Sequence, residues 1–278
     1  MSGYGYTGPY ASKGGFDLIA QGMSGLMSVT GDGDGPPVKV GYPITDIGSG
    51  MYAAIGILAA LIAREKMGEG QFVDTSLFET GVAWAMMPAL NYFADGTIPQ
   101  RMGSTSPQSA PYQAFETKDG AITVGTGNDF LWGKFCDIFN LSYLLNDPEY
   151  STNTLRVKNQ KSLSLTIQKA LKKITTQDCV QRLDSAGIPC GPINTLDKVL
   201  VDPQVIARNL IIEMDHKKAG KVKTLAFPVK LSKTPANIQL APALLGEHTT
   251  EILNNLGYKD EEITQLEKEG VIETYKGK

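Results

Sequence analysis

A small-residue turn, Gly41–Gly50, leads directly into a long apolar segment, and this junction constrains the fold more than any other stretch of the chain. The short apolar segment from Val38 is interrupted by Pro43, and Asp46 then stands where a helix needs an N-cap. The apolar run Met51–Ala63 is shorter than the roughly 20 residues that cross a bilayer. We therefore expect a helix that is buried on most sides, and no membrane span.

Asp46 is our candidate nucleophile. An aspartate at the start of a helix accepts backbone N–H bonds and faces the positive end of the helix dipole, which favours its charged form. Gly48 and Gly50 place no side chains on the first turn, which would let a bulky ligand approach the carboxylate. The same pattern also occurs in helices whose aspartate is only a structural cap, so both interpretations stand at this stage.

Charge and cysteine usage exclude several other classes of function. The formal net charge is -3 and no long basic run is present, so we expect no binding to nucleic acid or to a membrane surface. Three cysteines and two histidines lie at wide, irregular spacing, which predicts neither a metal site nor a disulfide framework. The first residues resemble no targeting peptide, and we expect a cytoplasmic protein.

The chain divides into five parts by composition and periodicity. Its 278 residues are enough for one large domain or two smaller ones. A segment rich in Gly, Ser, Thr and Pro, without periodicity, separates two regions and is interpreted as a linker. The expected parts are a large domain over residues 1–95, a linker over 96–111, a small domain over 112–190, a return linker over 191–240 and C-terminal helices over 241–278.

Periodicity and capping residues predict the individual elements. Ser76 and Glu79 form a capping box that opens a helix, and Pro88 should kink or end it. A helix over 17–29 should bury Leu18, Ile19, Met23, Leu26 and Met27, and one from about 159 should bury Leu163, Ile167, Leu171 and Ile174. Further helices are expected from 46 to about 68, from 128, over 177–186 and twice before 269, and strands over 71–75, 112–115, 121–125 and 222–227.

Several short stretches, spread over nearly the whole chain, form a pattern through their order and spacing. They are Ser2–Gly5 with Gly8 and Pro9, Phe16 and Asp17 with Gln21, Gly25–Met27, Thr45–Ile47 with Gly50, Gly70 and Gln71, Ala110–Phe115 with Lys118–Gly120, Gly187–Asn194, and Leu244–Thr249. In this order and spacing the chain resembles the class III (family III) CoA-transferases, the superfamily that includes formyl-CoA transferase, carnitine CoA-transferase and α-methylacyl-CoA racemase. Within the family, the chain looks most like the dicarboxylate-using members similar to succinate–hydroxymethylglutarate CoA-transferase.

The resemblance implies roles for individual residues. Asp46 falls on the family's catalytic aspartate, which attacks an acyl-CoA thioester and becomes an aspartyl-CoA thioester. Asp17 matches a supporting acid of the family, although it could equally be a helix cap. Phe16 stands where the racemases carry a histidine base. A phenyl ring accepts no proton, so racemase activity ranks below CoA transfer and is the alternative function. The weaker candidates for substrate or CoA contacts are Lys13, Phe16, Gly103 and Ser106.

The family fold is a large α/β domain of nucleotide-binding type, a smaller α/β domain and a C-terminal segment that returns to the large domain, in an interlocked homodimer. We expect this α/β fold with the N-terminal part of the large domain missing. The implied substrates are an acyl-CoA and a free carboxylic acid, with coenzyme A thioester as substrate and no tightly bound cofactor. A second alternative is an inactive fragment that serves assembly with a partner chain. If a targeting peptide preceded residue 1, the location would be the mitochondrial matrix.

Overall fold

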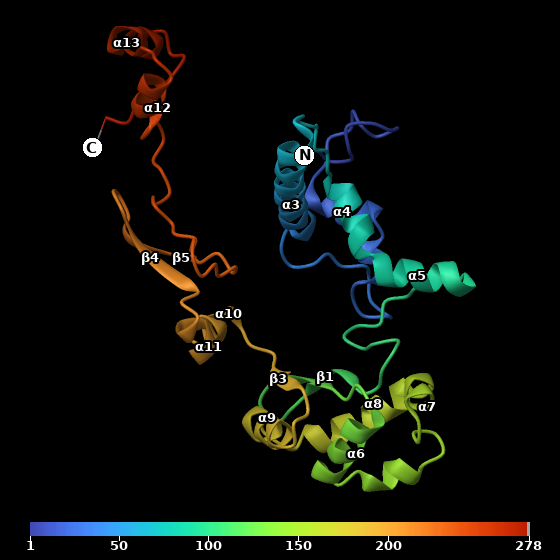
Figure 1. Ribbon diagram of the computed structural model, residues 1–278. Coiled ribbons are helices and arrows are strands. Elements are labelled where there is room, and N and C mark those ends of the chain that lie inside the picture. Colours follow the sequence, from blue (N-terminus) through green and yellow to red (C-terminus); the bar gives the residue numbers. More distant parts are fainter. Residues whose placement is uncertain (277–278) are drawn as a thin grey trace. The chain divides into compact units, whose positions relative to one another are not determined.

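The computed structural model describes residues 1–276 and separates into two compact units, residues 1–193 and the residues from 194 on (Figure 1). The first unit contains helices, a three-stranded sheet and the well-packed core of the chain. Its elements are α1 (Asp17–Met23), α2 (Leu26–Val29), α3 (Ile44–Met67), α4 (Leu77–Trp84), α5 (Met86–Asp95), β1 (Tyr112–Glu116), β2 (Ala121–Gly125), α6 (Asp129–Ile138), the 3-10 helix η1 (Ser142–Asn146), α7 (Asn153–Lys158), α8 (Gln160–Leu171), α9 (Thr176–Ser185) and β3 (Cys190–Pro192).

The expected helix over residues 17–29 is two short helices rather than one. Gly25 lies between them with φ of 88°, a left-handed conformation that glycine adopts without steric cost and that ends α1. The residues that α1 buries are Ala20 and Gln21. The prediction of its inner face was therefore wrong, since three of the apolar side chains expected inside are about half exposed: Leu18, Ile19 and Met23.

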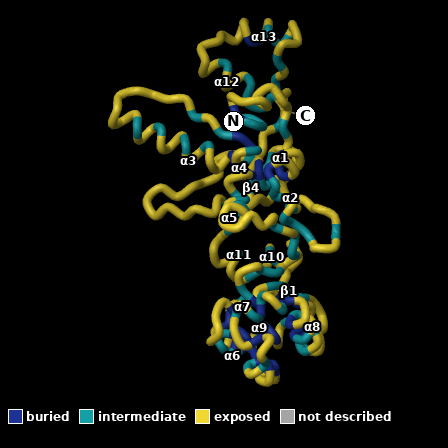
Figure 2. The backbone as a smooth tube through the Cα atoms, turned by 90° about the vertical axis from the view of Figure 1, so that its right-hand side faces the viewer, coloured by how far each residue is buried: buried dark blue, intermediate teal, exposed yellow. Residues whose placement is uncertain are grey.

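The helix α3 confirms the predicted helix at residues 46–68 but not its burial. It begins at Ile44 and ends at Gly68, whose φ of 80° forms the C-cap. Only three of its 24 residues are buried, Thr45, Gly48 and Ser49, and Figure 2 shows the rest of the helix mostly exposed. In the described residues it is the one helix long and apolar enough to cross a membrane, so the prediction that no span is present is not confirmed.

The first turns of α3 nevertheless pack on α4. A Cβ atom added at Gly48 would lie 2.5 Å from the Trp84 ring and 2.8 Å from the Thr80 methyl group, so only glycine permits this approach. Ser76 caps α4 as predicted, because its hydroxyl accepts the backbone N–H of Glu79 at 3.2 Å. The helix then breaks at Ala85, shortly before Pro88, as the proline predicts.

The segment over residues 71–75 does not form the expected strand. The backbone pairing here is an isolated parallel bridge between Ser2 and Ser76, extended by a hydrogen bond from Phe78 N to Gly3 O of 3.0 Å. A regular strand needs such pairing along several residues. In residues 1–276 the described pairing with Ser2 reaches only Thr75, the last residue of the segment. Residues 71–75 therefore form no regular strand.

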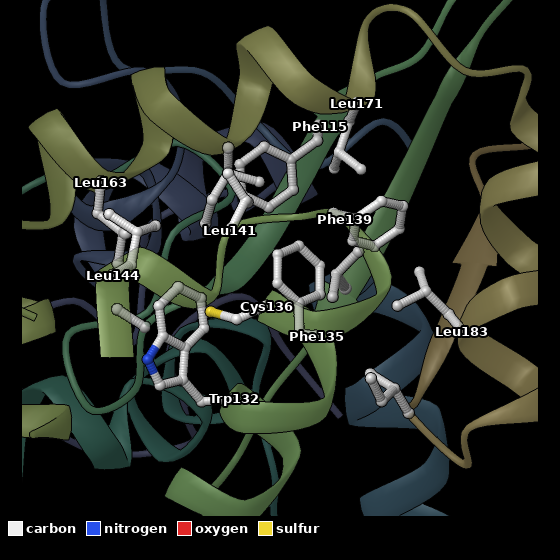
Figure 3. Packing of buried hydrophobic residues seen from close by; sticks show 14 of the residues in the cluster. Phe115, Trp132, Phe135, Cys136, Phe139, Leu141, Leu144, Leu163, Leu171 and Leu183 are labelled. Carbon is white, nitrogen blue, oxygen red and sulfur yellow. The ribbon is translucent and has the colours of Figure 1, made fainter. Parts of the chain in front are cut away.

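The core of the first unit lies between the sheet and the helices α6, α8 and α9. The sheet order is β1-β2-β3 and both pairs are antiparallel, with Phe115 opposite Ile122 in the first pair. The predicted hairpin of β1 and β2 is confirmed. The apolar stripe of α8 is confirmed at Leu163, Ile167 and Leu171, whereas Ile174 lies after the helix and is half-buried. Figure 3 shows aromatic rings of α6 packed against leucines of α8, and the most buried members include Trp132, Phe135, Ile122, Leu163, Ile167, Leu171 and Leu183.

The second unit holds a two-stranded hairpin that the sequence only half predicted. Its elements are α10 (Leu196–Val199), α11 (Pro203–Ala207), β4 (Ile211–His216), β5 (Gly220–Leu225), α12 (Thr249–Asn255) and α13 (Asp260–Lys268). The strand β5 overlaps the expected strand over 222–227, whereas β4, its antiparallel partner, was missed. The stretch over 191–240, interpreted as a return linker, contains α10, α11 and the hairpin of β4 and β5, and the two predicted terminal helices are confirmed as α12 and α13.

Candidate functional site

Asp46 is the third residue of α3, not its N-cap. The helix begins two residues earlier, at Ile44, and Pro43 precedes it without a side-chain cap. The prediction of an aspartate N-cap was wrong because the turn closes immediately after Pro43, a residue whose fixed φ suits the start of a helix. Asp46 is exposed, and no hydrogen bond or ion pair in residues 1–276 engages its carboxylate. The carboxylate is thus accessible on the first turn, where the helix dipole favours negative charge.

The cap of α3 comes from Asp17, on α1. Its Oδ1 accepts the backbone N–H of Thr45 at 2.9 Å and the Thr45 hydroxyl at 2.8 Å. Thr45 is fully buried, so these bonds are shielded from water. Asp17 is not the cap of its own helix, whose N-cap is Phe16, and its carboxylate instead caps the helix that carries Asp46.

Gln21, one of the residues that carry the family resemblance but for which no role was predicted, extends this network. The side chain is fully buried and lies one turn after Asp17 on α1. Its Nε2 donates to Asp17 Oδ2 at 2.7 Å, and its Oε1 accepts the backbone N–H of Val40 at 2.9 Å. The signal that could have found it is the spacing of four residues between Asp17 and Gln21, which places both side chains on one face of a helix.

The two glycines of the first turns lie on different sides of α3. Gly48 is buried against Trp84, so its lack of a side chain serves packing between helices. Gly50 is exposed, and a Cβ atom there would meet nothing within 4 Å. Because residues four apart share a helix face, Gly50 lies on the side of Asp46. Of the two, Gly50 alone leaves space beside the candidate nucleophile.

The remaining candidates of the N-terminal loop are exposed. Phe16 precedes α1 with 78% of its surface exposed. Lys13 places its ammonium 4.0 Å from the centre of the Tyr10 ring, a cation–π contact. Tyr10 in turn meets Tyr4 edge to face, with ring centroids 5.6 Å apart. Lys13 therefore contacts an aromatic cluster, and no contact between Lys13 and Asp46 is described in residues 1–276.

Gly103 and Ser106 lie together at a cavity of about 550 Å³ between α5 and the loop over residues 97–108. Apolar side chains and several amides and hydroxyls line it, with no charged group. Asp46, Asp17, Phe16 and Lys13 are not among the lining residues, which are Val29, Met87, Pro88, Asn91, Thr97, Ile98, Pro99, Gln100, Met102, Gly103, Thr105, Ser106, Pro107 and Gln108. The structure thus places the sequence candidates in two groups.

Side chains of α7 and α8 anchor the end of this loop, which the sequence did not predict. Asn153 donates to Gln108 O at 2.8 Å, and Gln160 donates to Ser106 O at 3.2 Å. The fully buried Arg156 donates through Nε to Ala110 O at 2.8 Å. A buried guanidinium is costly unless its donors are satisfied, so these carbonyl contacts hold the loop at the small domain.

The cysteines offer no competing nucleophile. Burial raises the pKa of the Cys136 thiol to about 12, and burial and the neighbouring Asp184 raise that of Cys190 to about 11. Burial also raises the pKa of Cys179. Since the thiolate is the reactive form, all three stay protonated near neutral pH. Within residues 1–276, no group of three or more His, Cys, Asp and Glu side chains is placed to hold a metal ion.

Comparison with known proteins agrees with the sequence resemblance. The sequence pattern of CoA-transferase family III matches residues 1–249. Human succinyl-CoA:glutarate CoA-transferase is 38% identical over 276 residues, which cover 99% of this chain and 63% of the human protein. The succinate–glutarate CoA-transferase of Agrobacterium fabrum is 34% identical over 256 residues, covering 92% of this chain and 64% of that protein.

The fold is similar to that of a solved relative. The crystal structure of a CAIB/BAIF family protein from Brucella suis superposes with a TM-score of 0.79 and is 36% identical, covering 92% of this chain and 66% of the crystallised one. This chain therefore spans a little under two thirds of the length of these relatives. Because the family pattern extends over most of its residues, the chain belongs to CoA-transferase family III.

Proposed function

We propose that the chain is an acyl-CoA:carboxylate CoA-transferase in which Asp46 is the nucleophile and dicarboxylic or short-chain acids are the substrates. The observation that carries the proposal is the carboxylate of Asp46, which is exposed and has no side-chain partner among residues 1–276, on a helix start that the Asp17 carboxylate holds in place. The names of the relatives support the substrate class, since they include transferases for succinate and glutarate. The acyl donor is a coenzyme A thioester, which the enzyme uses as a substrate rather than as a bound cofactor.

The proposed reaction passes through two states on Asp46. Its carboxylate attacks the thioester carbonyl of the donor, the C–S bond breaks, and a mixed anhydride and the CoA thiolate form. The thiolate then attacks the Asp46 acyl carbon, which leaves an aspartyl-CoA thioester and releases the first acid as its carboxylate. The acceptor carboxylate repeats both steps in reverse order, which yields the new acyl-CoA and restores the Asp46 carboxylate.

The start of α3 suits this chemistry. A helix leaves the first backbone N–H groups without intrahelical partners, and Asp17 uses that of Thr45. The N–H groups of Ile44 and Ile47 bond to Tyr42 O and Pro43 O, which leaves the N–H of Asp46 without a described partner in residues 1–276. That N–H and the helix dipole would stabilise an oxyanion that forms beside Asp46. A carboxylate is a weak nucleophile in water, and holding it next to the thioester recovers much of the entropic cost of the encounter. The open side at Gly50 gives the thioester room to approach.

Racemisation is the alternative within the superfamily, and Phe16 argues against it. The side chain directly before α1 is an exposed phenyl ring, which can neither accept nor donate the α proton of a 2-methylacyl-CoA. We expect no solvent deuterium at the α carbon when the chain is incubated with such a substrate in heavy water. Deuterium incorporation at the α carbon that is faster than with the Asp46→Asn variant would indicate racemisation instead of CoA transfer.

The second candidate function is assembly, which the exposed apolar surface of α3 favours. Apolar side chains at a helical spacing of 4, 3 and 4 residues lie more than half exposed on it, and a surface of this kind is normally covered by another polypeptide. They are Met51, Ile55, Leu58 and Ile62.

Four expectations from the sequence stay predictions. They are the interlocked homodimer, the incomplete large domain of nucleotide-binding type, the packing of residues 241–278 on that domain, and the cytoplasmic location.

Intact-mass measurement separates transfer from a purely structural role. We expect a CoA adduct on the wild-type chain after incubation with succinyl-CoA, and conversion of that adduct to a hydroxamate with hydroxylamine. The Asp46→Asn variant should form neither. Asp34→Asn, which removes another exposed aspartate, serves as the matched control and should behave like the wild type. A wild-type chain that stays unmodified at saturating succinyl-CoA would leave assembly as the function.

A further inference from the structure

The turn that leads into α3 depends on few contacts. Its residues Gly41, Tyr42 and Pro43 are exposed, and a Cβ atom at Gly41 would meet nothing within 4 Å. Within the turn, the described backbone bond joins Ile44 N to Tyr42 O at 2.8 Å. The path of the chain here must therefore be fixed from outside the turn, at the residues that precede and follow it.

Gln21 holds both ends of this turn through one amide. Its Oε1 accepts the N–H of Val40, the residue before the turn, at 2.9 Å. Its Nε2 donates at 2.7 Å to Asp17 Oδ2, while Oδ1 of the same carboxylate accepts from Thr45 at the start of α3. Asp46 is the next residue, so the bonded chain from Val40 to Thr45 ends beside the candidate nucleophile.

The two partners determine how the amide of Gln21 must lie. The carboxylate of Asp17 accepts only, and the backbone N–H of Val40 donates only, so the reversed amide would place oxygen against oxygen and N–H against N–H. The side chain is fully buried, and water therefore cannot replace either bond if the amide is lost. No shorter or apolar side chain can make both contacts.

We propose that Gln21 is a positioning residue for Asp46. It orients the Asp17 carboxylate toward Thr45 and ties the entering segment at Val40, so that the first turn of α3 presents Asp46 in one place. The inference rests on the proposed function for its catalytic consequence, because it concerns the nucleophile of that reaction. A displacement of about 1 Å at a reacting group can lower a rate about 100-fold, so loss of the amide should act on the rate of acylation.

The test compares Gln21→Leu with Thr126→Val. Both remove a buried polar group, and Thr126, whose hydroxyl donates to Pro111 O at 3.1 Å, lies in the small domain after β2. We expect Gln21→Leu to speed amide hydrogen exchange about 10-fold or more over residues 40–47, and Thr126→Val to leave that segment unchanged. Gln21→Met, which keeps an unbranched side chain, replaces the leucine variant if the latter does not fold.

The kinetic part of the test measures formation of the CoA adduct on Asp46 against succinyl-CoA concentration. Gln21→Leu should lower the maximal rate constant about 10- to 100-fold and change the half-saturating concentration by less than about twofold. Unchanged exchange over residues 40–47, or a loss of rate no greater than that of Thr126→Val, overturns the positioning role. If the wild-type chain forms no adduct, the proposed function fails, and the exchange comparison still decides whether Gln21 holds the start of α3.

Discussion

Alanine substitutions at Gly48 and Gly50 should change stability in opposite directions. In an exposed helix interior, replacing glycine by alanine stabilises by roughly 0.5 to 1 kcal/mol, because the unfolded chain loses conformational freedom. Gly50 meets this condition, since its added Cβ has no neighbour within 4 Å. At Gly48 the same atom would lie 2.5 Å from the rigid Trp84 ring and 2.8 Å from Thr80, which is itself buried.

An ordinary carbon contact is about 3.5 to 4.0 Å, so α3 and α4 must separate by roughly 1 Å to accept the Gly48→Ala side chain. Overpacking of this kind costs about 1 to 3 kcal/mol, which exceeds the propensity gain. We expect net destabilisation of about 1 to 2 kcal/mol for Gly48→Ala and stabilisation of about 0.5 to 1 kcal/mol for Gly50→Ala.

Urea unfolding followed by tryptophan fluorescence and circular dichroism measures both changes. With a slope of about 2 kcal/mol per molar urea, the midpoints should move down by about 0.5 to 1 M for Gly48→Ala and up by about 0.2 to 0.5 M for Gly50→Ala. Equal stabilisation by the two substitutions would show that α3 does not pack on α4 through Gly48, and would refute the account of the helix start.

Three further predictions follow from single contacts. Asp17→Ala should destabilise by about 1 to 2 kcal/mol in urea unfolding and should slow adduct formation on Asp46, because it removes the cap at Thr45. The Lys217 ammonium and the N–H of Leu244 lower the pKa of Glu247. The stabilisation by the Glu247 carboxylate is therefore present above its ordinary pKa of about 4.5 and is lost as pH falls through the lowered value. Glu247→Gln should remove this pH dependence from the free energy of unfolding measured between pH 7 and pH 3. Cys190, with a pKa of about 11, should react with iodoacetamide at pH 8 on the order of 100-fold more slowly than free cysteine, and peptide mass mapping that finds it labelled at the free rate would contradict its burial beside Asp184.

Local signals predicted those elements whose stability is also local. The cap at Ser76, the break before Pro88 and the stripe of α8 depend on residues within a few positions of one another, and each is confirmed. The strand β4 was missed because its alternation of apolar and polar residues is weak beside the charged residues at its end. The prediction of a strand over 71–75 was wrong because a strand also needs a partner along its length. The composition of the segment suits a strand, but its described backbone pairing lies only at its C-terminal end.

The candidate site shows the same division between local and long-range information. Asp46 was singled out first by its place at the start of a helix and Asp17 by the family resemblance, but Asp46 was placed at the wrong helical position. The bond between Asp17 and Thr45 joins residues 28 positions apart, which no helical periodicity reports. Gly48 was given a role in ligand approach because sequence alone cannot distinguish a glycine that faces open space from one packed against Trp84.

The burial of α3 could not be predicted from its apolar composition. A helix rich in Ile, Leu and Met indicates that some surface should cover it, but the sequence does not state whether that surface belongs to the same chain. In the described residues most of the helix is exposed. The match covers only 63% of the human relative and 66% of the Brucella suis protein, so proteins of this family contain further surface that the present residues do not supply.

A chase experiment can follow both halves of the proposed transfer of CoA through Asp46. The chain is first incubated with succinyl-CoA, separated from free thioester, and digested to locate the CoA adduct by peptide mass. We predict an adduct on the peptide that contains Asp46, and its disappearance when glutarate is added, with formation of an equal amount of glutaryl-CoA. An adduct on another residue, or one on Asp46 that glutarate and other dicarboxylates fail to discharge, would contradict the account.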